Sequence, residues 1–353
     1  RHGFGEDIPK KRSGATINRR DLITIPLPSA KLLWHDLHVR ESQIVDGEGG
    51  TRNVRIDIIV EGVTEDEPWK CGMEFDYANP ESIYARSLRL SEEDKKNRMP
   101  VPEAAANTQI AFLPPMSGLA ATELRLDPGA INVRIGEGRT AEVLRNLCFR
   151  LVESDPEDER WERLKSQMAS MFGVKLNVPV YIPKRGEITL SYEDISGVEL
   201  DISSSGRGLQ QVLLLLAYLY ANPGSVLLLD EPDAHLEILR QRQIYRLISE
   251  TARRQGAQVI AASHSEVVLN EAADKDVVIA FVGKPHRIDD RGSQVLKALK
   301  SIGYDQYYQA ERAGWVLYLE GSTDLAVLQA LAERLNHPAE AILERPFVHY
   351  IGN

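Results

Sequence analysis

The sequence predicts an α/β protein with two domains. Residues 1–310 are expected to form a parallel sheet with an antiparallel β-subdomain and a helical hairpin, and residues 311–353 to begin a second α/β domain. Three patterns lead to this prediction. A short apolar run at 226–229 follows a turn, as expected for a buried parallel strand. Alternating apolar and polar residues at 51–63 indicate antiparallel strands, and apolar positions three or four apart at 161–171 indicate an amphipathic helix.

Composition limits the classes of function. A chain of 353 residues can bury the cores of two domains. Its net charge of −10 excludes a general nucleic-acid binder, so a contact with DNA would have to use local basic patches. Cys71 and Cys148 lack metal-ligand spacing and suit a reducing compartment. Because the sequence has neither a transmembrane run nor a signal peptide, we expect a cytoplasmic protein with no membrane partner.

The first 22 residues are polar and carry basic clusters at 10–12 and 19–20. No secondary structure is predicted for them, and they suit either a solvated loop or a surface that contacts phosphate groups. From there the pattern changes to strands, which together predict a structural β-subdomain. The strands are expected at residues 31–40, 51–63 and 69–77, with a glycine-rich loop at 46–50.

The next part of the chain is expected to mix strands and helices. Residues 82–99 are charged and partly helical in pattern, and residues 110–113 form a short strand. A strand at 131–135 then leads through the glycine-rich segment 136–140 into a helix at 141–152. This segment is no phosphate-binding loop, because such a loop needs a lysine before its final Ser or Thr and a different glycine spacing. A turn that caps the helix is the better interpretation.

An antiparallel helical hairpin is predicted from this helix and the amphipathic helix that follows it. The second helix buries Trp161, Leu164, Met168 and Met171, which lie three or four positions apart. Two strands at 178–182 and 187–192 then lead toward a serine-rich segment.

Small and polar residues open the apolar helix predicted at 208–220. Serine is a good N-cap, and the unpaired N–H groups of a helix start attract anions. A phosphate-binding helix start is therefore one interpretation, and an ordinary capped core helix is the other. The residues of this segment are Ser203, Ser204, Ser205, Gly206, Arg207, Gly208 and Gln210.

Two adjacent acids, Asp230 and Glu231, end the strand at 226–229, and Pro232 stops it. Open α/β sheets bind ligands outside the carboxyl ends of their strands, so these acids are candidates for a ligand site. The alternative is a solvated acidic turn. Two further polar residues, Asp233 and His235, follow this strand. The next apolar strand is predicted at 259–262, and His264 follows it.

In this order the parts resemble the C-terminal half of an ATP-binding-cassette (ABC) ATPase, with an ABC/SMC-like fold. The strand with Asp230 and Glu231 resembles a Walker B motif. That resemblance implies that Asp230 holds Mg²⁺ through its water shell and that Glu231 activates the attacking water. The segment SSSGRGLQQ resembles the LSGGQ signature, which contacts the γ-phosphate of an ATP held by the opposite protomer, although Arg207 departs from the usual pattern.

The remaining polar residues extend this resemblance. Asp233 and His235 resemble a D-loop at the dimer interface, and His264 resembles the switch histidine that hydrogen-bonds the γ-phosphate. The resemblance implies ATP and Mg²⁺ as cofactors, and a homodimer or higher homo-oligomer that sandwiches ATP. A transporter ATPase fits poorly, because no coupling segment for a membrane partner is apparent.

The C-terminal part has a different pattern. A strand is expected at 277–282, a polar connector at 287–310, and a strand at 315–319 that ends in Glu320 and Gly321. An apolar helix runs on to residue 335, and a second strand opens at 347–351. From the residues alone, this is either a metal site or a strand-to-helix turn with Ser322 or Thr323 as the N-cap.

The segment LEGSTD resembles the opening of a Toprim fold. By that resemblance Glu320 would bind Mg²⁺ or Mn²⁺ for phosphodiester chemistry. Asp324 is either a second ligand or a residue that only favours the positive helix N-terminus. An ABC ATPase followed by Toprim is the layout of the OLD (overcoming lysogenization defect) family. The resemblance implies an ATP-dependent DNA endonuclease, in phage defence or DNA processing. The alternative is a non-nucleolytic ATP-gated DNA clamp or sensor that recruits an effector partner.

Two departures from the family pattern matter. The sequence contains no G-x-x-x-x-G-K-[ST] motif, and it ends before the later Toprim acids. We therefore expect an internal piece of a longer protein, which begins after the phosphate-binding loop and ends inside Toprim. Such a piece should bind ATP poorly and cut no DNA by itself.

Overall fold

The structure is a computed structural model of the chain. It describes residues 14–22, 27–45, 48–91, 97–116, 118–153, 159–272, 275–281, 285–287, 315, 317–344, 346 and 348–350. The chain divides into two compact units. One contains Arg1–Ala234 with Ile248–Ala262, and the other contains His235–Leu247 with Ser263–Asn353. The predicted domain boundary after residue 310 lies outside the described residues and stays a prediction.

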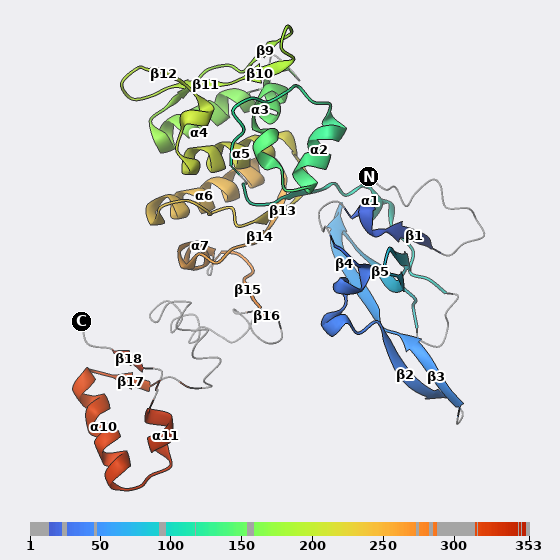
Figure 1. The fold of residues 1–353 in the computed structure, drawn as a ribbon, viewed down its shortest axis with the longest axis vertical. Helices are drawn as coiled ribbons and strands as arrows, with labels where there is room; N and C mark the ends of the chain where they lie inside the picture. The colour runs from blue at the N-terminus through green and yellow to red at the C-terminus, as the bar shows by residue number, and fades with distance from the viewer. Residues whose placement is uncertain are drawn as a thin grey trace. The chain divides into compact units, whose positions relative to one another are not determined.

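An antiparallel sheet forms the first part of the first unit, as the alternation predicted (Figure 1). Its core contains Ala30, Trp34 and Ile83, and the indole N–H of Trp34 donates to the carbonyl of Val54 at 2.7 Å. A separate hairpin pairs β2 (Arg40–Val45) with β3 (Glu48–Asn53). The strand order of the sheet is β1 (Ala15–Asn18), β6 (Ser82–Ser87), β5 (Glu67–Asn79), β4 (Arg55–Thr64).

Three predictions for this part were wrong. The segment after residue 13 contains β1 and the short turn η1 (Arg19–Asp21), because β6 provides an edge for pairing. Residues 31–40 form mostly the 3₁₀ turns η2 (Ala30–Leu33) and η3 (His35–Leu37), which bring Ala30 and Trp34 over the sheet. Residues 82–87 are strand rather than partly helical, because pairing with β1 and β5 overrides their charged pattern. The basic cluster at 10–12 lies outside the described residues.

Glu74 in β5 is fully buried and joins several segments of this sheet. Its carboxylate pairs with Arg55, Arg86, Arg89 and Arg98, at 3.0 Å for Arg89 and 2.6 Å for Arg98. Burial alone would raise the pKa of Glu74, but the hydrogen bonds from Arg89, Arg98 and Arg86 outweigh it and hold the pKa well below its usual range. These arginines therefore stabilise the sheet through a buried anion.

A parallel sheet forms the centre of the first unit. Its order is β14 (Gln258–Ala262), β13 (Val226–Asp230), β7 (Ile110–Leu113). One face is covered, and Leu227 and Leu229 are buried there. On the other face Ile110 and Ile260 are 68% and 63% exposed. The strand at 226–229 was predicted to be buried on both faces of the sheet, and this is correct for one face only. The prediction that β14 is a buried strand was wrong.

The helices that cover this sheet lie close together in the chain. The helix α5 (Arg207–Ala221) is buried along almost its whole length and packs against α3 (Leu144–Glu153) and α4 (Arg160–Phe172) (Figure 1). The hydroxyl of Tyr218 donates to the carbonyl of Phe112 at 2.9 Å, which ties α5 to β7. The helices α3 and α4 also pack against each other, as the predicted antiparallel hairpin requires.

One strand prediction here was wrong. Residues 131–135 belong to the helix α2 (Pro128–Gly136), which Pro128 begins and in which Ile131 and Ile135, four residues apart, are both buried. The helix expected at 141–152 starts at Leu144, after the turn η4 (Thr140–Glu142). The smaller elements of this unit are α1 (Glu103–Asn107), β8 (Lys175–Leu176), β9 (Val180–Ile182), β10 (Glu187–Thr189), β11 (Ser191–Glu193) and β12 (Glu199–Asp201).

The second unit contains short elements and a parallel strand pair. The helix α6 (Ile238–Arg254) has residues in both units. The strands β17 (Leu317–Leu319) and β18 (Val348–Tyr350) occur where strands were predicted. They are parallel, and two helices separate them in the chain. No helix in the described residues combines the length and the apolar character needed to span a bilayer. The other elements are α7 (Glu266–Ala272), β15 (Ile279–Ala280), β16 (His286–Arg287), α10 (Ser322–Arg334) and α11 (Ala339–Leu343).

Candidate nucleotide site

Asp230 and Glu231, which we call the acidic edge, lie where the central strand of the parallel sheet ends. Asp230 pairs in register with Ala262 of β14. The backbone N–H of Glu231 then donates to the carbonyl of Ala262 at 2.9 Å. Both acids therefore lie at the carboxyl edge of the sheet, the edge at which open α/β sheets bind ligands.

Glu231 has an unusual backbone. Its φ is +46°, in the left-handed region that residues with a side chain seldom adopt. The turn is held from both sides, because the N–H of Ala234 donates to the carbonyl of Glu231 at 3.0 Å. Strain of this kind collects at functional sites, where the surroundings enforce it.

The polar residues around the end of β13 differ in exposure. Asp230 is half-buried, and its carboxylate has no hydrogen bond or ion pair within the described part of the chain. A hard oxygen ligand with unused lone pairs fits Mg²⁺, which binds few carboxylates and keeps several waters. Asp233 is buried, whereas His235 is exposed and also has a left-handed backbone, with φ +62°.

Residues 201–206, which we call the serine turn, are held by internal hydrogen bonds. Asp201 caps the 3₁₀ turn η5 (Ile202–Ser204), and its Oδ1 accepts from the N–H of Ser203 at 2.8 Å and from the Ser203 hydroxyl at 2.6 Å. The hydroxyls of Ser204 and Ser205 donate to the carbonyls of Asp201 and Ile202, both at 2.7 Å. The three serines therefore shape the turn.

Gln210 holds the same turn from inside α5. Its side chain is buried, and its amide nitrogen lies 3.2, 3.4 and 3.0 Å from the carbonyl oxygens of Ile202, Ser203 and Ser205. Sequence patterns suggested a place beside a nucleotide. The contacts give this amide a positioning role, so its effect on a ligand would be indirect.

The start of α5 is the exposed end of the serine turn. Gly206 is its N-cap and has an extended backbone without a side-chain cap. A Cβ added there would meet no atom of the described residues within 4 Å. Arg207 is exposed and Gly208 is half-buried. An open helix start with unpaired N–H groups and an adjacent guanidinium can bind an anion such as a phosphate group.

His264 follows the edge strand β14. It lies two residues after Ala262 in the chain and is exposed. Next to it, Ser265 caps α7, because its hydroxyl accepts from the N–H of Val268 at 3.2 Å and donates to Gln241 at 2.8 Å. The structure assigns His264 and Glu231 to different compact units.

The C-terminal candidates lie between β17 and α10. One carboxylate oxygen of Asp324 accepts from the backbone N–H groups of Glu320 and Gly321, at 3.0 and 2.9 Å. Asp324 is therefore a capping residue of α10, and a role as metal ligand stays a prediction. No set of three or more His, Cys, Asp and Glu side chains that could hold a metal occurs among the described residues.

Residues outside the predicted motifs also shape the site. Asp201 was missed, although an Asp two residues before Ser203 is a common turn signal. Arg145, whose Nη2 lies 3.0 Å from Asp201 Oδ1, was missed as well. No local pattern could have identified Arg145, because it lies 56 residues away in the chain.

A family model described as "AAA domain, putative AbiEii toxin, Type IV TA system" matches residues 147–270. The matched segment contains the serine turn, α5, the acidic edge and His264. This part of the chain is therefore an AAA-type ATPase domain. No curated protein matches the sequence.

Several solved structures are similar to parts of this chain. An SMC head domain from Thermotoga maritima is 14% identical, the match covers 66% of this chain and 73% of that one, and the TM-score is 0.37. An Smc head domain with a coiled coil and joint from Pyrococcus yayanosii is 17% identical, with 48% and 31% covered and a TM-score of 0.30. Scores this low establish no common fold, so the ATPase assignment depends on the family match.

Proposed function

We propose that this chain is the ATP-hydrolysing core of an ATP-dependent DNA-processing protein, in which two copies enclose the nucleotide. One observation carries the proposal. Asp230 and Glu231 lie at the carboxyl end of the central parallel strand, inside the segment that matches an AAA family. Paired acids at this edge are what Mg²⁺-dependent hydrolysis of a nucleoside triphosphate requires.

Each acid has a separate role in this proposal. Asp230 holds Mg²⁺, which neutralises phosphate charge when it is bound. Glu231 accepts a proton from the attacking water, and its left-handed backbone sets the direction of its side chain at the strand end. His264 donates a hydrogen bond to the terminal phosphate.

The second copy supplies the opposite side of the site. The N-terminus of α5 at Gly206, with Arg207, contacts the terminal phosphate of an ATP held by the other copy. Asp233 and His235 lie beside the interface between the copies. A homodimer closed by ATP follows from this arrangement.

Replacing Glu231 by Gln tests the hydrolysis step. In the protein expressed from its complete reading frame, Glu231→Gln should lower ATP turnover by about 10²-fold or more, the usual scale for removal of a positioned base. ATP binding should remain, because Asp230 and the phosphate contacts are unchanged. Steady-state phosphate release and equilibrium ATP binding measure the two effects.

Glu237→Gln is the matched control, because this glutamate is exposed six residues further along the chain. It should hydrolyse ATP like the unmodified protein. If Glu231→Gln turns over as fast as this control, Glu231 is not the base and the proposed site is wrong.

A second candidate activity is metal-dependent cleavage of DNA, as in the OLD family. The observation in its favour is the parallel pair β17 and β18 with two helices between them, which places Glu320 at a strand end. A carboxylate in that position can hold Mg²⁺ or Mn²⁺ for phosphodiester hydrolysis. The AAA-type part would then gate the cleavage.

Glu320→Ala should abolish metal-dependent nicking of plasmid DNA and leave ATP turnover unchanged.

Asp324→Ala shows whether Asp324 is only a helix cap or also a metal ligand. Loss of the cap alone lowers stability by about 1 kcal/mol and leaves cleavage intact, whereas loss of a ligand removes cleavage. If the protein nicks no DNA with any nucleotide, or if Glu320→Ala cuts normally, an ATP-gated DNA clamp or sensor that recruits an effector is the better account.

A further inference from the structure

The serine turn is connected to the helix α3 through one buried cation. The side chain of Arg145, in α3, is 1% exposed. Its guanidinium donates to the carbonyls of Ala120 and Ala121 at 2.9 and 3.3 Å, and to Oδ1 of Asp201 at 3.0 Å. A buried guanidinium is stable only with such partners, so its position is fixed.

Two acids lie near this cation, and they differ in what else they bind. Glu123 accepts from the backbone N–H groups of Arg145 and Asn146 at 2.9 and 2.6 Å, and thereby caps the start of α3. Its Oε2 lies 3.8 Å from the Arg145 guanidinium, and burial raises the pKa of Glu123. Asp201 is the closer acid, and its side chain is 46% exposed. Asp201 is therefore the main counter-charge of Arg145.

Asp201 transmits this contact to the turn. The oxygen that accepts from Arg145 is also the oxygen that accepts from the N–H and hydroxyl of Ser203. Burial alone would raise the pKa of Asp201, but the hydrogen bonds from Ser203 and the charge of Arg145 outweigh it and leave the pKa below its usual value. Asp201 is therefore an ionised cap, and a shift of Arg145 would shift the turn.

We infer that Arg145 is a positioning residue: acting through Asp201, it holds the serine turn so that the start of α5 can contact a phosphate group. The turn is then held from two sides, by Arg145 from α3 and by Gln210 from α5. Gly206 follows Ser203 by only three positions in the chain, so a displacement of Asp201 also displaces the open helix start. This inference rests on the proposed function, because it names the residue that prepares the contact made across the dimer.

Asp201→Asn is the main test, because the side chain is half-exposed and the substitution keeps its shape. The amide oxygen can still accept from Ser203 and from Arg145, but the negative charge that pairs with the buried guanidinium is lost. We expect kcat for ATP hydrolysis to fall about tenfold or more, because a buried cation without its counter-charge no longer holds a fixed position, with KM for ATP nearly unchanged. Arg145→Lys keeps the positive charge but loses the planar guanidinium that donates to several acceptors at once. It should lower kcat by less than Arg145→Met, which also loses the charge.

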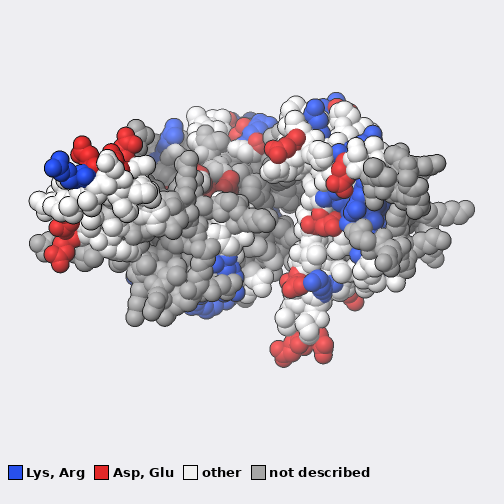
Figure 2. Space-filling view, turned by 90° about the horizontal axis from the view of Figure 1, so that it is seen from below, with Lys and Arg blue, Asp and Glu red and all other residues white. Residues whose placement is uncertain are grey.

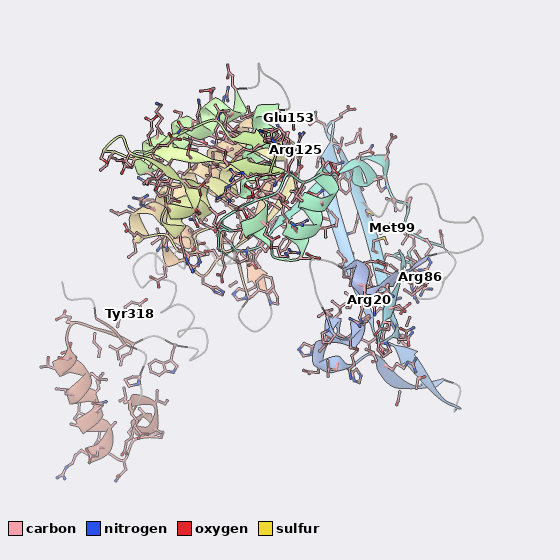
Figure 3. The ribbon with its side chains drawn as sticks, turned by 45° about the horizontal axis from the view of Figure 1, so that its top comes forward. Arg20, Arg86, Met99, Arg125, Glu153 and Tyr318 are labelled. Carbon is pink, nitrogen blue, oxygen red and sulfur yellow. The ribbon has the colours of Figure 1, made fainter. Side chains whose placement is uncertain are left out.

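Arg125→Met is the matched control. Arg125 also connects α3 to its surroundings, through an ion pair with Glu153 at 2.6 Å (Figure 3) and through contacts over the rings of Phe149 and Tyr181. Within the described residues its side chain makes no hydrogen bond or ion pair with the serine turn. This variant should lose some thermal stability and keep its kcat. An equal fall of kcat in Arg125→Met and Asp201→Asn would mean that general weakening of α3 explains both.

A mixing experiment separates positioning from a defect in the same copy. A dimer of one Asp201→Asn and one Glu231→Gln protomer has both changes in one site and leaves the other site intact. Random mixing of these two weakly active variants should therefore restore about one quarter of the activity of the unmodified protein, because half of the dimers are mixed and each has one intact site.

The outcomes are distinguishable. If Glu231→Gln alone is fully active, the proposed function fails. If Glu231→Gln is inactive and Asp201→Asn has normal kcat, the positioning role of Arg145 is overturned and the proposed hydrolysis site stands. If both variants are impaired and mixing restores nothing, the contact across the dimer is wrong, and the positioning role fails with it. Should Asp201→Asn fail to fold, Arg145→Lys mixed with Glu231→Gln gives the same comparison.

Discussion

The serine turn and the acidic edge differ in how their polar side chains are used. In the serine turn, every serine hydroxyl and the amide of Gln210 bond within the protein. At the acidic edge, the backbone holds the position, and the carboxylate of Asp230 has no partner in the described part of the chain. The serine turn is shaped by its side chains, whereas the acidic edge is shaped by its backbone.

This difference changes what each motif can do. Side chains that already bond to the protein are unsuited to bind a ligand, so the serine turn offers a helix start: the N–H groups near Gly206 and the guanidinium of Arg207. The acidic edge offers the carboxylate of Asp230. Acidic and basic side chains also lie side by side over the described surface drawn in Figure 2. A binding site therefore depends on specific positions such as these two, and overall charge is a poor guide.

The largest expected effect is on dimer closure, which depends on the open space at Gly206. Gly206→Leu should fold normally, because the φ of Gly206 is −65° and a Cβ there meets no atom within 4 Å in the part of the chain that the structure describes. The added side chain would fill the space that a phosphate of the other copy needs. ATP should then no longer drive dimerisation in a Glu231→Gln background, while each protomer still binds ATP. Sedimentation velocity with and without ATP measures this.

Gly129→Leu is the control for that substitution. Gly129 lies in α2, is exposed and also has open space around a Cβ. The control should dimerise with ATP like its parent. If Gly206→Leu closes as well as Gly129→Leu, the start of α5 does not face the partner's nucleotide.

Loss of a polar group should lower the unfolding free energy much more in the serine turn than at the acidic edge. Gln210→Leu removes the donor from the carbonyls of Ile202, Ser203 and Ser205, and should cost about 1–3 kcal/mol of unfolding free energy. Asp230→Asn removes a carboxylate with no partner in the described residues. It should change the unfolding free energy by less than about 0.5 kcal/mol. Urea denaturation of both variants provides the comparison. A larger loss for Asp230→Asn would contradict it.

Much of this contrast could be predicted from sequence, and the rest depends on distant contacts. The turn before residue 226 and the two acids after residue 229 predicted a strand that ends at the ligand edge, and β13 ends at Asp230 as expected. The helix α5 was predicted from its apolar run and from the small and polar residues that open it. Exposure of β14 was not predictable, because a strand such as QVIAA has the same pattern at the edge of a sheet as in its middle. The internal bonding of the serines depends on Asp201 and Arg145, and so on a contact that no local pattern contains.

The smallest expected effect concerns the left-handed backbone of Glu231. At most positions a glycine is less stable than an alanine by about 0.5–1 kcal/mol, because it loses more backbone freedom on folding. At φ +46° the order should reverse, since only glycine adopts this region without a steric cost. Glu231→Gly should therefore be more stable than Glu231→Ala by up to about 1 kcal/mol, and both should lose ATP turnover like Glu231→Gln. At Glu237, whose φ is not positive, Gly should be less stable than Ala. Urea midpoints of the four variants test this, and the same order at both positions would show that the acidic edge is not strained.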